Sequence, residues 1–330
     1  MLKRLRLKKG IRKLTWPEVW QVIKSTFIEF FQENSFFHGA ALAYYAVFAL
    51  VPMIYLSLIS FGKFVGQANM LKIIDKILRE EVGLEDSSGI MSFLEEVDFE
   101  KGSFVLNIVG VVALLLSSSA LLASLRTSIN EFFDIHYVIE DRKRRIFHNL
   151  GTRLMNVVLL PVFGLVIVVT YFGETIILSV SSQLFGELNA VEGFILDILK
   201  HGLAIFTNVL LFAIIFKYLH DGKVEWKLAF SGAMVTAVLL YIGQLLIHFY
   251  LKNYFFGSSI GLPGTILIML AWMYYSSQII FLGAKFTKVY AVKVGKPIVF
   301  QSRRFQAKRA AVEAGKTVKR GSAKASAGKS

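Results

Sequence analysis

The chain has 330 residues, of which 55% are hydrophobic and only 18% charged, and its mean hydropathy is +0.57. Soluble domains carry roughly 25% charged residues, so this composition excludes an ordinary soluble fold and indicates a membrane protein. The chain has no cysteine, which excludes disulfides, thiolate metal sites and cysteine nucleophiles. A net charge of +14 is typical of nucleic-acid binding as well as of membrane topology, so the position of the charges decides its meaning.

Residues 1–38 are predicted to form a basic N-terminus that leads into an amphipathic helix. They contain no apolar segment followed by a small-residue cleavage site, so we expect no cleaved signal peptide. Thr15 and Glu18 have the spacing of a capping box. The apolar residues that follow at helical spacing are Trp16, Trp20, Ile23, Phe27 and Phe30 or Phe31. Such a helix lies in the inner membrane interface or packs on the cytoplasmic ends of the spans, and the pattern leaves both alternatives open.

Six later segments have the roughly 20 mostly apolar residues of a spanning helix. They are 39–61, 103–125, 154–180, 198–219, 228–250 and 262–286. The first has small residues along one face at Gly39, Ala43 and Ala46, which favours close helix contact, and Pro52 predicts a kink. The sequence therefore predicts an all-α polytopic membrane protein, with six transmembrane helices over residues 39–290 plus the N-terminal amphipathic interfacial helix.

Lysine and arginine are concentrated on one side of this six-span topology. Residues 1–38, 126–153, 217–227 and 285–330 together hold 30 of the 37. Because cytoplasmic loops carry the excess of Lys and Arg, both termini are expected in the cytoplasm. At the end of the sixth span, Lys285 is expected to snorkel to the inner interface.

Two polar segments complete the domain organisation. The loop 63–102 is the sizeable external element and carries nine acidic residues, with helical spacing at Leu71, Ile74, Ile77 and Leu78 and again over 90–97. A solvated acidic face is the simpler interpretation of this loop, and a vestibule that collects cations is the alternative. Residues 291–330 form a basic cytoplasmic tail that is expected to be disordered. Basic termini attract anionic lipid headgroups, and no specific nucleic-acid partner is expected, because no folded nucleic-acid module accompanies the charge.

Polar side chains inside the predicted spans are energetically costly and therefore indicate function. Seven of them are candidates for lining a polar cavity that moves a small solute or ion: Glu174, Asn208, Tyr241, Gln244, His248, Tyr275 and Gln278. Glu174 and His248 would be the titratable members of this cavity. The alternative interpretation is that such groups form hydrogen bonds between helices, worth roughly 0.6 kcal/mol each.

No catalytic, cofactor-binding or metal-binding set is recognisable in the sequence. The six histidines lie in different segments, and neither a GxSxG nor a P-loop motif is present. Glu131, Asp134 and His136 are three potential metal ligands, but the arginines that follow at 142–145 favour an interfacial helix end. We therefore expect no enzymatic activity, no cofactor and no metal.

Several stretches resemble the YihY/BrkB family of bacterial membrane proteins. The resemblance is strongest at Ala40 to Pro52 in the first span and Leu270 to Thr287 in the last, and it is supported by Ser128 to Asp134 and by Gly232-Ala233. It implies a six-span bacterial inner-membrane protein. Family members carry the labels virulence factor and ribonuclease BN, which name no mechanism. This chain departs from the family in having Lys285 where an acidic residue is usual, and in lacking a Pro near His220 and Asp221.

Three function hypotheses follow from these observations. The first is a transporter, channel or lipid-handling protein of the inner membrane, because polar faces surround a kinked first span. The second is a non-transporting envelope scaffold that holds partners through the basic tail and the acidic loop. The third, a membrane-tethered ribonuclease, is the weakest, because no acid–base or metal set is visible. The bilayer is the expected partner, and a homo-oligomer is compatible with the sequence.

Overall fold

The computed structural model describes residues 14–80, 87–96, 104–135, 190–254 and 261–300, and residues 155, 158, 159, 162, 165, 166, 170 and 173. The described chain is almost entirely helical. Its helices are α1 (Trp16–Gln32), α2 (Ser35–Val65), α3 (Gln67–Glu80), α4 (Ser88–Glu96), α5 (Phe104–Phe132), α7 (Ala190–Tyr218), α8 (Trp226–Tyr254) and α9 (Gly261–Lys293). Two short strands, β1 (Gly222–Lys223) and β2 (Val299–Phe300), pair antiparallel.

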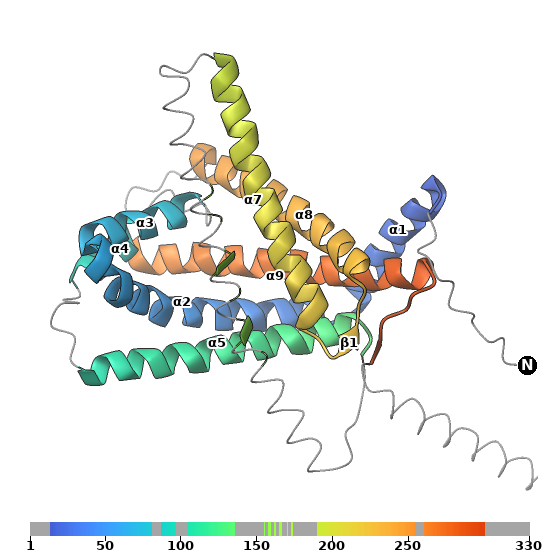
Figure 1. Ribbon diagram of the computed structural model, residues 1–330, viewed down its shortest axis with the longest axis horizontal. Helices are drawn as coiled ribbons and strands as arrows, with labels where there is room; N and C mark the ends of the chain where they lie inside the picture. Colours follow the sequence, from blue (N-terminus) through green and yellow to red (C-terminus); the bar gives the residue numbers. More distant parts are fainter. Residues whose placement is uncertain are drawn as a thin grey trace, which may run out of the picture.

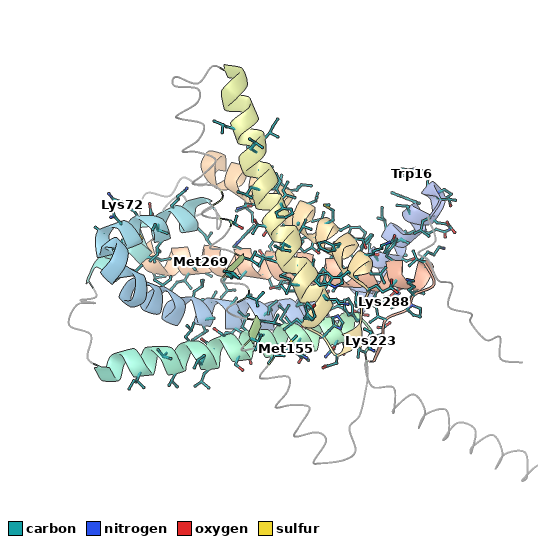
Figure 2. All side chains as sticks on the ribbon, viewed as in Figure 1. Trp16, Lys72, Met155, Lys223, Met269 and Lys288 are labelled. Atoms are coloured by element: carbon teal, nitrogen blue, oxygen red, sulfur yellow. The ribbon has the colours of Figure 1, made fainter. Side chains whose placement is uncertain are left out.

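The helices form a bundle with two distinct ends. Helices α2, α5 and α9 run side by side, and α7 and α8 cross them obliquely as a contacting pair (Figure 1). Helix α1 packs on α9 at one end, here called the terminal end, where Lys223 and Lys288 also lie (Figure 2). Helices α3 and α4 cover the other, far end, where Ile74, Ile90 and Leu94 pack around Met269 of α9.

Four helices within the described residues are long and apolar enough to cross a membrane. They are Ile108–Phe132, His201–Tyr218, Trp226–Ile247 and Ile266–Lys293, and Ser35–Leu50 is a shorter apolar helix. They coincide with five of the six predicted spans, whereas most of 154–180 lies outside the described residues. Helix α2 continues past Pro52 to Val65, and the kink at that proline stays a prediction.

The predicted polar segments have mixed outcomes. Both helices expected in the loop 63–102 are present as α3 and α4. Helix α1 begins as expected, because the backbone N–H of Thr15 donates to Oε2 of Glu18 at 2.9 Å. Residues 1–13 and 301–330 lie outside the described residues, so the disorder expected of the basic tail stays a prediction.

The outer surface of the bundle is apolar over long stretches. On α8, exposed side chains recur every turn at Phe230, Met234, Val238, Ile242 and Leu246. On α5, Leu116 is 68% exposed. Stripes of this length are not tolerated in water, whereas lipid is as apolar as these side chains. The structure therefore fits the membrane environment that the composition predicts.

Helices α8 and α9 approach closely where each places a glycine against a threonine of the other. A Cβ on Gly232 would overlap the hydroxyl of Thr287, and a Cβ on Gly283 would overlap the hydroxyl of Thr236. Both threonines donate within their own helix, Thr236 to the carbonyl of Gly232 at 2.9 Å and Thr287 to that of Gly283 at 2.7 Å. In lipid the hydrophobic effect does not drive helices together. Small residues instead allow close van der Waals contact, which stabilises the helix pair.

This crossing makes Gly232 intolerant of a side chain. We expect Gly232→Ala to lower the free energy of unfolding by about 1–3 kcal/mol, because the new methyl group forces α8 away from α9. Gly202→Ala on α7 is the matched control, because nothing lies within 4 Å of its Cβ position, and it should be neutral or slightly stabilising. Thermal unfolding of both variants in detergent measures the difference, and equal midpoints would contradict the crossing.

Candidate functional site

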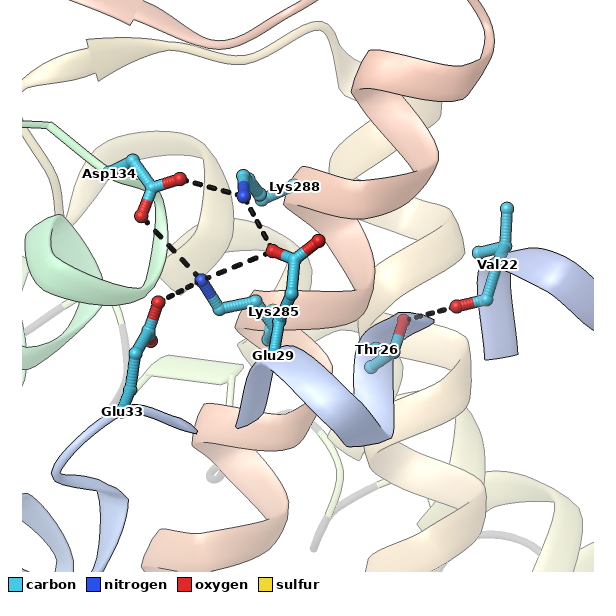
Figure 3. Close-up of polar contacts among 7 residues, drawn as sticks. All are labelled: Val22, Thr26, Glu29, Glu33, Asp134, Lys285 and Lys288. Atoms are coloured by element: carbon cyan, nitrogen blue, oxygen red, sulfur yellow. Dashed lines mark hydrogen bonds and ion pairs between the residues drawn. The ribbon is translucent and has the colours of Figure 1, made fainter. Parts of the chain in front are cut away.

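Five charged side chains meet at the terminal end of the bundle and are here called the charge cluster: Glu29, Glu33, Asp134, Lys285 and Lys288 (Figure 3). The ammonium of Lys285 donates to Oε1 of Glu33 and lies 3.8 Å from Oε2 of Glu29 and 3.7 Å from Oδ1 of Asp134. Lys288 contacts Oε2 of Glu29 at 2.6 Å and Oδ2 of Asp134 at 2.7 Å. The cluster thus joins α1, the end of α5 and α9.

Helical spacing explains why these residues face one another. Lys285 and Lys288 are three residues apart on α9, and Glu29 and Glu33 are four apart at the end of α1, so each pair shares one face of its helix. Helix α1 packs on α9 and thereby brings the two faces together. Lys285 is fully buried, so the expectation that it snorkels to water was wrong. Three carboxylates held nearby replace the water that a snorkelling ammonium would reach.

Asp134 reaches the cluster through an unusual backbone conformation. Its φ is 54°, the left-handed region that few residues other than glycine adopt. The turn is a Schellman motif, because the N–H of Asp134 donates to the carbonyl of Glu131 at 2.9 Å and that of Ile135 to Asn130 at 2.8 Å. Aspartate tolerates this region better than most residues, and its carboxylate ends beside both lysines.

The cluster contains one more acid than base, and one of its polar atoms and two others on α2 and α9 are unsatisfied. Oε2 of Glu33 is buried without a hydrogen-bond partner among the described residues, as are Oγ of Ser35 and Oε1 of Gln278. Burial raises the pKa of Glu33 above its ordinary 4.5, and the hydrogen bond from Lys285 opposes that shift. Buried polar atoms without partners are sites where water or a polar solute gains hydrogen bonds.

A second polar group ties the end of α5 to the connection between α7 and α8. Arg126 donates to Oδ1 of Asp221 at 3.1 Å, and both are nearly fully buried. The Asn130 side chain donates to Oδ2 of Asp221 at 2.6 Å and accepts from the Asp221 backbone N–H at 2.9 Å. No local pattern in the sequence predicts this group, since its members lie in segments about 90 residues apart. The sequence signal at this place is the departure from the family pattern near His220 and Asp221, where a Pro is usual.

Two of the residues predicted to line a polar cavity, Tyr275 and Gln278 of α9, have well-defined neighbours. Tyr275 donates weakly to the carbonyl of Leu239 on α8 at 3.4 Å and packs on Gly243. Gln278 faces α2 instead, where its amide donates to the carbonyl of Ser35 at 3.2 Å and fills the space over Gly39. The two side chains, three residues apart on α9, thus contact different neighbouring helices.

The remaining candidates are placed as follows. Tyr241 packs edge-on against the ring of His201 at 5.6 Å between α8 and α7. Asn208 and Gln244 are half-buried on α7 and α8. Glu174 and the side chain of His248 lie outside the described residues. A shared polar cavity stays a prediction. Among the described side chains, no group of three His, Asp or Glu could hold a metal ion.

His220, which precedes Asp221, is held in its neutral form. One ring nitrogen, Nδ1, accepts from the N–H of Gly222 at 2.9 Å, and the other, Nε2, lies 2.8 Å from the carbonyl of Phe216. The acceptor role of Nδ1 places the proton on Nε2, which donates to that carbonyl. Burial lowers the pKa of His220 from 6.5 to about 4. Protonating the ring requires loss of the bond from Gly222.

This shift predicts that the fold weakens in mild acid. The pKa is lower in the folded state, so the contribution of His220 is complete above pH 6.5 and is lost as the pH falls toward 4. Between pH 7 and pH 5 the loss should be about 2 kcal/mol. Chemical unfolding of the wild type and of His220→Gln at both pH values isolates this part of the pH dependence. An unchanged pH dependence in His220→Gln would contradict the assignment.

Comparison with known proteins places this architecture in one family. The family model described as Virulence factor BrkB matches residues 26–304. The chain is 24% identical over 262 residues to a UPF0761 membrane protein of Alkalilimnicola ehrlichii, covering 77% of this chain and 54% of that protein. It is 22% identical over 291 residues to one of Rhodospirillum centenum, covering 87% and 62%. A third, of Pseudoalteromonas translucida, is 24% identical over 249 residues, covering 74% and 78%.

These relatives support the family assignment and name no activity. The chain spans little more than half the length of the first two. Their printed names give a membrane protein and no enzymatic activity. No solved structure matches the chain. The family match covers most of the sequence and confirms the resemblance found at the first and last spans, so the chain belongs to the BrkB virulence factor family of membrane proteins.

Proposed function

We propose that the chain is a six-span inner-membrane transport protein for a small solute or ion, with both termini in the cytoplasm. In this proposal the charge cluster closes the cytoplasmic end of a polar pathway between the helices. The observation that carries the proposal is the fully buried Lys285, paired with carboxylates from two other segments and adjoining unsatisfied buried polar atoms.

The path of the chain supports six spans. The ends of α5 and α7 lie together at the terminal end, as the Arg126–Asp221 contact requires. Because α5 and α7 both end there, six spans require one further crossing between these two helices. The described residues of the segment between them support this path, because Thr170 contacts Thr207 at 2.8 Å and Gly173 lies against Leu203, which is an antiparallel course beside α7.

The distribution of charge supports cytoplasmic termini. Helix α1, the α7–α8 connection and the end of α9 all lie at the terminal end. They and the neighbouring segments 1–13, 136–153 and 301–330 contain most of the lysine and arginine residues of the chain. Cytoplasmic loops carry this excess in inner-membrane proteins, and the acidic segment 63–102 belongs to the opposite end.

The chemistry of the cluster fits a contact that opens and closes better than one that only stabilises the fold. Replacing a buried ion pair by apolar residues is often neutral or stabilising, so such pairs are poor devices for stability alone. When two segments separate, water can replace the ion pairs between them, because each charged side chain is well hydrated. Oε2 of Glu33 belongs to the cluster, Ser35 follows two residues later, and Gln278 donates to the Ser35 carbonyl. The unsatisfied atoms of these three residues can accept hydrogen bonds from an entering solute or donate them to it. We therefore infer that α1 moves against α9 when the pathway opens.

Cysteine accessibility tests this proposal, because the chain has no cysteine of its own. A single cysteine replaces Gln278, and inverted vesicles expose the cytoplasmic side to a membrane-impermeant thiol reagent. We expect slow labelling that accelerates about tenfold or more when Glu29→Gln and Glu33→Gln remove the pairing carboxylates, since each 1.4 kcal/mol withdrawn from the closed state increases the open population tenfold.

Two control cysteines make the result interpretable. Lys227→Cys, exposed at the terminal end, should react in inverted vesicles in both backgrounds, and Lys72→Cys on α3 should react only in intact cells. A cysteine at Gln278 that stays unreactive from both sides in both backgrounds would describe a dry, packed bundle. That outcome would overturn the transport proposal and leave the envelope scaffold as the better hypothesis.

A further inference from the structure

We propose that the outer face of α1, formed by Trp16, Trp20, Ile23, Phe27 and Phe31, docks on the anionic phospholipid surface of the cytoplasmic leaflet. The proposal goes beyond transport and does not depend on it. The sequence left open whether this helix lies in the membrane interface or packs on the cytoplasmic ends of the spans. In this proposal α1 does both, because one face packs on the bundle and the other faces lipid.

The two faces of α1 differ sharply in burial. Val22, Thr26 and Phe30 are at most 6% exposed, and Thr26 donates to the carbonyl of Val22 at 2.7 Å inside the contact (Figure 3). On the outer face, Trp16 is 85% and Phe31 63% exposed. Five large apolar side chains in one stripe form a patch that marks an interaction surface.

Continuity with the spanning surface identifies lipid as the occupant. Phe31 at the end of α1 packs against Phe36 at the start of α2, with ring centroids 6.3 Å apart. Exposed aromatic side chains continue along α2 at Phe37, Tyr44 and Phe48. Because α2 enters the bilayer from this end, the outer face of α1 extends the lipid-facing surface to headgroup depth. Tryptophan is enriched at that depth.

The charges of α1 are arranged for an anionic surface. Glu18 caps the start of the helix, where it accepts from the Thr15 backbone N–H, while Glu29 and the C-cap residue Glu33 turn inward to Lys288 and Lys285, away from the outer face. Lys24 remains exposed on the helix, and Lys293 is exposed beside it, where it donates to Gln21 at 2.8 Å. Cations on a helix with an apolar face strengthen its binding to anionic lipid.

Tryptophan fluorescence tests the docking in the full chain. The chain has four tryptophans, so Trp226→Phe with Trp272→Phe leaves only the two of α1. In nanodiscs that hold one copy, lipids brominated near the headgroup should quench roughly half or more of this emission, while aqueous iodide quenches little. Quenching should be stronger in discs of anionic lipid than in zwitterionic discs, and Lys24→Gln should reduce that difference.

The matched variant Trp16→Phe with Trp20→Phe reports the two tryptophans outside α1 and shows whether the bundle is intact in the same discs. Emission from α1 that iodide quenches and brominated lipid does not would place the face in water and overturn the proposal. Shielding from iodide that appears only in discs with two copies would also overturn it, because a second copy would then cover the face. The cysteine test of the gate is a separate measurement with its own controls, so failure of the docking proposal and failure of the transport proposal are distinguishable.

Discussion

The structure depends above all on the burial of one ammonium group. Lys285 lies on α9 with no exposed surface, and an unpaired charge in that position would cost several kcal/mol or more. Three carboxylates meet this requirement, and they come from α1 and from the turn that follows α5. The positions of α1 and of the end of α5 are therefore linked to a single residue of the last helix. Asp134 accepts a left-handed backbone for the same purpose, since its carboxylate reaches both lysines.

A bundle in lipid gains little from the hydrophobic effect between its helices, and this chain uses two other forces. Close van der Waals contact joins α8 to α9, where Gly232 and Gly283 admit the threonines opposite. Charge and hydrogen bonding join the segments at the terminal end, through Lys285 and through Arg126 with Asp221. The two forces differ in how they respond to movement. Interlocked side chains resist separation, whereas charged groups that part are stabilised by water. The proposed movement of α1 against α9 therefore separates charged groups and leaves the interlocked α8–α9 contact in place.

The sequence predicted the helices well and the charge cluster poorly, for a physical reason. Apolar length and Lys/Arg asymmetry act locally, so the sequence located the capped start of α1 and the helices α5, α7, α8 and α9. One end of each of these four helices lies within two residues of its predicted position, and the other end extends four to eight residues beyond it. The cluster brings together residues 29, 33, 134, 285 and 288 from three distant segments, and no local sequence pattern predicts that these residues are close in space. The incorrect prediction for Lys285 illustrates this point. A lysine near the end of a span ordinarily reaches water, and only the fold shows the three carboxylates around its ammonium group. Tyr275 and Gln278, three residues apart, diverge because α9 lies between α2 and α8.

The stripe proposed to face lipid and the carboxylates proposed to form the gate both lie on α1 and its C-cap residue Glu33. Phe27 and Phe31 point outward, and Glu29 and Glu33 point inward, within the same two turns. A helix cannot shift one face without the other, so a change in how deeply α1 sits in the headgroup layer changes the distance between its carboxylates and the lysines of α9. Ion pairs weaken with separation and with entry of water, which raises the local dielectric constant. Docking and gating, if both hold, are therefore not independent properties of this chain, and the lipid composition around α1 would bias the cluster toward its closed or its open state.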